Sequence, residues 1–98
     1  MRYHELLLKF LEGIQGGDVR SDIIATFGLI LEAYRIGRIG DEELKKDLKE
    51  LCLDILVSKY PLKSVEELRE EAEEWAEKFY RVFRFEVIRD RYMGLLPP

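Results

Sequence analysis

Apolar residues recur at three- and four-residue spacing along most of this 98-residue chain, which is the period of a helix with one buried side. The pattern is interrupted by three glycines (Gly13, Gly16 and Gly17), then by Gly37 and Gly40, and then by Pro61. Glycine permits backbone turns that other residues avoid, and proline ends a helix. The sequence therefore predicts an all-α protein, a single domain over 1–98 in which four helices form an up-down bundle.

The first two predicted helices differ in how much of their surface is apolar. The first spans residues 3–14 and has one apolar face. The second follows a cap at Asp18 or Ser21 and is apolar around nearly its whole circumference. Because such a helix must be surrounded, we expect it at the centre of the bundle or within an interface.

The third predicted helix spans residues 41–59, with Asp41 as its cap and Pro61 beyond its end. Ser64 and Glu67 form a capping box, S-x-x-E, that starts the fourth and longest helix, at residues 65–91. Within it, residues 82–88 alternate apolar and charged side chains, so a short extended segment is the alternative there.

The last third of the fourth helix has apolar side chains on two faces. One broad face, from Leu68 to Val87, suits the core, whereas Phe85, Ile88 and Tyr92 lie on nearly the opposite side. A monomeric bundle cannot cover both faces. We therefore expect a homodimer whose interface holds the following residues: Phe85, Ile88, Tyr92, Arg81 and Arg84.

Charge is unevenly distributed along the same helix. Residues 64–77 carry seven acids and one base, for a net charge of −6, and residues 78–98 carry five bases and two acids, for +3. An antiparallel pair of these helices would place opposite charges side by side, whereas a parallel pair would place like charges together. The sequence thus favours an antiparallel dimer.

The basic end of this helix also supports a different class of function. Arginine interleaved with Phe83, Phe85 and Tyr92 is what phosphate contact and base stacking require. The alternative function is therefore a small nucleic-acid-associated regulatory protein that makes contact through Arg81, Arg84, Arg89 and Arg91. The overall charge of −4 confines such binding to this segment.

The hairpin at 37–46, with Leu31, Ala33 and Tyr34 before it, resembles the short helical oligomerisation hairpins that read L-x-x-x-Y-x-x-G-x-I-x-x-E-E, although Leu31 lies three residues before Tyr34 where that pattern has four. The resemblance covers less than a third of the chain, and Gly40 stands where that module usually has Thr or Ser. We interpret this pattern as a general signal of a hairpin between two helices.

The acidic half of the fourth helix resembles part of another family's site. Glu70/Glu73 and Glu74/Glu77 match the E-x-x-E motif that all-α nucleoside-triphosphate pyrophosphohydrolases use to hold Mg²⁺. The family's second motif, E-x-x-D, fails here because Arg89 follows Glu86 at that spacing. A metal-dependent hydrolase is therefore a weaker alternative than a solvated acidic face.

Few other residues could carry chemistry. His4 and Cys52 are each the single residue of their type, so one chain cannot assemble a zinc site from them, and no phosphate-binding glycine motif occurs. We expect no catalytic residue, metal or cofactor. The longest uncharged run is nine residues, against roughly 20 for a bilayer span, so no membrane association is expected.

The lone cysteine favours a reducing, cytoplasmic location. The absence of asparagine, with a single glutamine among many charged residues, favours a thermophilic source. The leading functional hypothesis is a non-enzymatic protein-interaction or scaffold module that acts as a homo-oligomer, with a homodimer as the expected form and another protein as a possible further partner.

Overall fold

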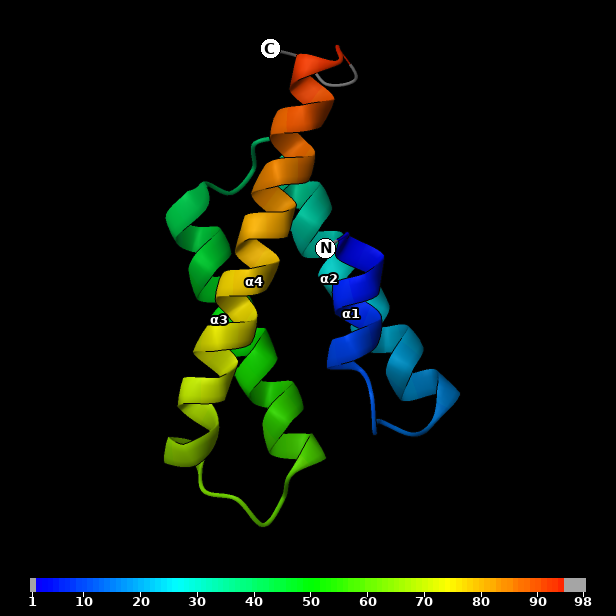
Figure 1. Ribbon diagram of the computed structural model, residues 1–98, viewed down its shortest axis with the longest axis vertical. Coiled ribbons are helices and arrows are strands. Elements are labelled where there is room, and N and C mark those ends of the chain that lie inside the picture. The colour runs from blue at the N-terminus through cyan, green and yellow to red at the C-terminus, as the bar shows by residue number, and fades with distance from the viewer. Residues whose placement is uncertain (1, 95–98) are drawn as a thin grey trace.

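The computed structural model describes residues 2–94, and within that range the chain forms four α-helices and no strand (Figure 1). They are α1 (Tyr3–Phe10), α2 (Gly17–Arg35), α3 (Asp41–Lys59) and α4 (Val65–Tyr92). The predicted all-α class, four helices and long last helix are confirmed. The extended alternative for residues 82–88 is wrong, because that segment continues α4 without a break.

Successive helices run in opposite directions, and α4 forms the long axis of the molecule (Figure 1). Helix α3 lies against α4 along much of its length, and α1 packs on another side of α4. Most of the contact between helices therefore involves α4.

Helix α4 begins where the sequence predicts. The Ser64 hydroxyl accepts a hydrogen bond from the Glu67 backbone N–H at 3.2 Å. This bond satisfies one of the donors that a helix start leaves without an intrahelical partner.

Helix α1 is shorter than predicted and ends at Phe10 instead of Ile14. The chain turns at Gly13, whose φ of +84° is readily adopted only by glycine. The Arg20 guanidinium then donates to the carbonyls of Leu11 at 2.9 Å and Ile14 at 3.2 Å. A side chain of α2 thus satisfies the backbone acceptors that follow α1.

The predicted caps of α2 and α3 are wrong. Helix α2 begins after Gly16 and α3 after Gly40, and neither start has a side-chain cap. Asp41 instead accepts a hydrogen bond from the Tyr34 hydroxyl at 2.7 Å. This bond ties the end of α2 to the start of α3 across the Gly37 turn, where φ is +79°.

The prediction that α2 is innermost is also wrong. Of its 19 residues only Phe27 and Leu31 are buried, whereas Leu29 is 72% exposed and Ile24 42% exposed. A helix that is apolar all round can be covered by its own chain or by another molecule, and the periodicity of the sequence does not distinguish these two kinds of cover. The interface alternative for α2 stays a prediction.

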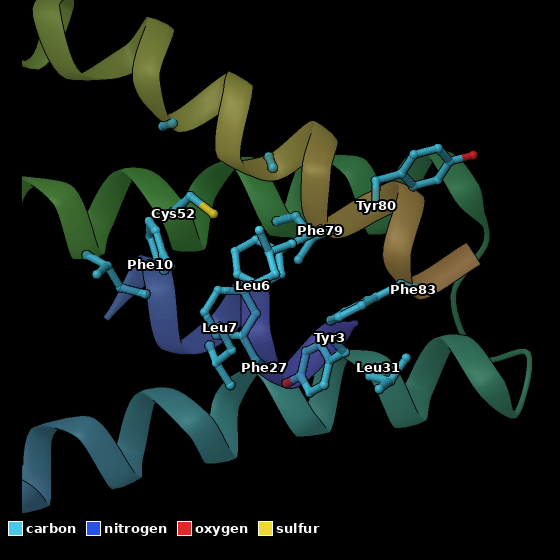
Figure 2. Close-up of a cluster of buried hydrophobic side chains, with 14 of the residues drawn as sticks. Tyr3, Leu6, Leu7, Phe10, Phe27, Leu31, Cys52, Phe79, Tyr80 and Phe83 are labelled. Carbon is cyan, nitrogen blue, oxygen red and sulfur yellow. The ribbon is translucent and has the colours of Figure 1, made fainter. Parts of the chain in front are cut away.

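All four helices contribute side chains to one core, which is centred on Phe79 of α4 (Figure 2). The Phe79 ring lies 4.5 Å from that of Phe27 and 5.6 Å from that of Phe10, measured between centroids, and also contacts Trp75 and Phe83. Because Phe10 belongs to α1, Phe27 to α2 and the other three rings to α4, the contacts of Phe79 hold these three helices together.

A buried carboxylate links the end of α2 to the end of α4. Asp90, whose side chain is 8% exposed, accepts from Arg35 at 3.1 Å and from Arg89 at 3.4 Å. Sequence analysis missed this contact, because Asp90 is one of 20 acids and nothing in its spacing separates it from the solvated ones.

Candidate interface on the C-terminal half of α4

Three apolar side chains near the end of α4 are left uncovered by the rest of residues 2–94. Phe85 is 66% exposed, Ile88 is 52% exposed and Tyr92 is 92% exposed. We call these three residues the C-terminal patch. The predicted exposure of these side chains is confirmed, and they lie on one side of α4 because they are three and four residues apart.

The four arginines singled out in the sequence differ in their ion-pair partners. Arg81 pairs with Glu77 at 3.1 Å, and Arg89 pairs with Asp90 at 3.4 Å. Arg84 and Arg91 are exposed, and neither has an ion-pair partner among residues 2–94. Because they are seven residues apart, these two free cations lie on the same side of α4.

Two hollows run along the line where α1 meets α4. The larger, of about 520 Å³, lies beside Arg2, which precedes α1, beside Glu5 of α1, and beside Val82, Phe85 and Arg89 of α4.

The smaller hollow, of about 270 Å³, lies next to it, and both touch Arg81 and Val82. Its lining consists of Leu6, Lys9, Trp75, Lys78, Arg81 and Val82. Sequence analysis did not predict that α1 lines these hollows. The contact between α1 and α4, which are far apart in the chain, cannot be inferred from the hydrophobic periodicity of either helix.

The acidic half of α4 is solvated. Glu70, Glu73, Glu74 and Glu77 border a shallow depression on the surface. Between residues 2 and 94, no three His, Cys, Asp or Glu side chains are placed to hold a metal ion together. The hydrolase alternative therefore gains no support from the arrangement of these carboxylates.

The two single-copy residues lie apart. His4 is exposed on α1, whereas Cys52 is fully buried in α3, and burial raises the pKa of its thiol to about 12. Because the thiolate is the nucleophilic form, this cysteine is inert at neutral pH in the folded chain.

Comparison with protein-family models, with curated proteins and with solved structures finds no match to this chain. None of the helices formed by residues 2–94 is both long enough and apolar enough to cross a membrane. The interpretation of the site therefore depends on the residues themselves.

Proposed function

We propose that the protein is a non-enzymatic interaction module that works as an antiparallel homodimer through α4. The observation that carries the proposal is the exposed C-terminal patch, which no part of the described chain covers. A contiguous exposed apolar patch is uncommon on a soluble monomer and typically marks an interaction surface.

The charges of α4 support a second copy as the partner. The acidic half of the helix and its basic half lie on one uninterrupted helix, so an antiparallel copy meets each half with the opposite charge. Complementary charges favour one orientation and speed the encounter of two molecules. Arg84 and Arg91 also lack intrachain partners, so they are available to the acidic half of a second copy.

We expect light scattering to give the mass of a dimer at tens of micromolar protein. Phe85→Asp, which replaces the large apolar ring of the C-terminal patch with a carboxylate, should shift the protein to the monomer mass, because the burial of that ring in the interface is lost. Arg84→Glu should weaken the dimer, because it removes a cation from the basic half.

Leu62→Asp is the matched control, since Leu62 is fully exposed and lies outside α4. This variant should stay dimeric. A monomer mass for the wild-type chain at this concentration would refute the proposal, as would a Phe85→Asp variant whose mass and melting temperature equal those of the wild type.

Arg84 and Arg91 also favour the second candidate, a nucleic-acid-associated protein. Both are exposed, both lack an ion-pair partner among residues 2–94, and Tyr92 beside them offers an exposed ring for stacking on a base. Arg81 and Arg89 contribute less than the sequence suggested, because Glu77 and Asp90 partly neutralise them.

If this second function is correct, duplex or single-stranded DNA should shift in a gel at low salt, and the affinity should fall steeply as salt rises. Arg84→Glu combined with Arg91→Glu should abolish the shift. The absence of any shift at low salt would remove this candidate.

A further inference from the structure

One continuous stripe along α4 has the spacing of a coiled-coil seam. Its members alternate steps of three and four residues over three heptads, and all are exposed except Glu71, which is partly exposed. We call this set the exposed stripe: Glu71, Glu74, Lys78, Arg81, Phe85, Ile88 and Tyr92.

The exposed stripe changes character along its length, from acidic to basic to apolar. An ordinary coiled coil is apolar throughout, so this stripe does not match a copy of itself at every register. Two copies of the stripe can therefore pair only in a register in which the acidic segment of one copy meets the basic or apolar segment of the other.

The smaller hollow beside α1 is a recess at the edge of the exposed stripe, which Lys78 and Arg81 of the stripe border. Four of its lining residues, Trp75, Lys78, Arg81 and Val82, come from two successive turns of α4. In a coiled coil, a knob of one helix enters a space between four residues of the facing helix. Leu6 of α1 adds an apolar side to this recess.

We infer that the dimer has a single register, with its twofold axis at Arg81, in which Phe85 of each copy enters the recess beside Lys78 of the other. This inference rests on the proposed antiparallel dimer and names its register. The stripe residues then pair so that their numbers sum to 162 or 163, which sets Tyr92 opposite the partner's Glu71 and Ile88 opposite the partner's Glu74. The paired region spans 22 residues, about 33 Å at 1.5 Å per residue.

The side chains that flank the exposed stripe support this register. In an antiparallel pair, residues on one flank of a helix face the same flank of the partner, so Arg84 faces the partner's Glu77 and Arg91 faces the partner's Glu70. The two free arginines of the monomer thus both gain carboxylate partners. Glu77 already pairs with Arg81 in its own chain, and its second oxygen is available to the partner's arginine.

The arginine at the axis is also accounted for. Arg81 faces its own copy in this register, and each of these guanidinium groups has a carboxylate at 3.1 Å within its own chain. Each of the two cations therefore already has a carboxylate beside it when the two copies meet, which reduces their repulsion.

Other registers fit the charges less well. With the axis near Ile88, the apolar residues of the C-terminal patch would meet each other, but Arg84 would approach the partner's Arg91 or Tyr92, and the acidic half would have no partner. A parallel pair would set every charge of α4 beside its like.

Cysteine cross-linking tests the register in the full chain. The native Cys52 is buried, so new surface thiols react against a low background. Arg81→Cys should cross-link to itself, because position 81 lies on the axis. Glu74→Cys and Ile88→Cys should each fail alone, since their own copies lie about 20 Å apart along the helix, but a mixture of the two should cross-link.

Each pattern has one meaning. Self-linking of Ile88→Cys would place the axis near the C-terminal patch and overturn the register while leaving the proposed dimer intact. Self-linking of all three variants would show a parallel pair and overturn both. A dimer mass with no cross-link in any variant would move the contact off α4, with Ile24 and Leu29 of α2 as the other exposed apolar face.

A charge exchange gives an independent test. Glu77→Arg and Arg84→Glu should each raise the dimer dissociation constant by about tenfold or more, and the variant with both changes should regain most of the affinity. Arg84→Glu combined with Glu66→Arg is the control, because position 66 lies beyond the paired region and should give no rescue. Equal affinities for both double variants would overturn the register.

Discussion

Phe79→Ala is expected to be the most destabilising single substitution in this chain, with a loss of about 3–5 kcal/mol in the free energy of unfolding. The Phe79 side chain is fully buried and contacts four other aromatic rings that come from α1, α2 and α4. Its removal leaves a cavity that no single helix can close, because the rings around it belong to three helices. A domain of this size should melt at least about 10 °C lower.

The matched control is Phe85→Ala, which makes the same change six residues further along α4 at a side chain that is 66% exposed. In urea titrations at one protein concentration, Phe79→Ala should lower the unfolding midpoint far more than Phe85→Ala does. Phe85→Ala should instead act on the dimer mass. If the two variants unfolded at the same midpoint, the placement of the core at Phe79 would be wrong.

The fourth helix shows what the sequence alone can predict. Its start at Ser64 depends on a local hydrogen bond, and its long apolar face depends on spacing within one segment, so both are visible in the pattern. The exposure of the C-terminal patch follows by elimination, because one helix cannot turn two opposite faces to the same core.

The second helix shows where that prediction stops. Its apolar circumference indicates that something covers it, but the pattern does not distinguish this chain from another molecule. In the structure, only Phe27 and Leu31 are buried, because α4, which is longer and carries the larger rings, supplies the centre of the core.

The candidate site was also predictable only in part. The side on which Arg84 and Arg91 lie follows from helical geometry, but their lack of partners does not, since it depends on which acids the fold brings near. The contribution of α1 to the hollows beside α4 likewise depends on tertiary contact. Local chemistry was therefore visible in the sequence, whereas the partners of each charge were not.

The carboxylate of Asp90 should account for the second large effect. Asp90→Ala removes the carboxylate that lies 3.1 Å from the Arg35 guanidinium. The Nε atom of the same guanidinium is buried and already has no hydrogen-bond partner among residues 2–94. Loss of one member of a fully buried ion pair costs about 3–5 kcal/mol, but Arg35 is 34% exposed and can reach water, so we expect about 2 kcal/mol. Urea unfolding at fixed protein concentration measures this loss.

The region that loses protection from amide exchange distinguishes the loss of this contact from a general destabilisation of α4. Because Asp90 ties α4 to the last turn of α2, amide exchange in Asp90→Ala should quicken first at the end of α2, while the Phe79 core stays protected. Arg89→Ala is the matched control, since it removes only the weaker contact at 3.4 Å from the more exposed partner and should cost less than about 0.5 kcal/mol.

In the variant with both Asp90→Leu and Arg35→Leu, much of the lost stability should return, because neither charge is then left unpaired. If Asp90→Ala unfolded within about 0.5 kcal/mol of the wild type, the link between α2 and α4 would contribute nothing measurable to stability.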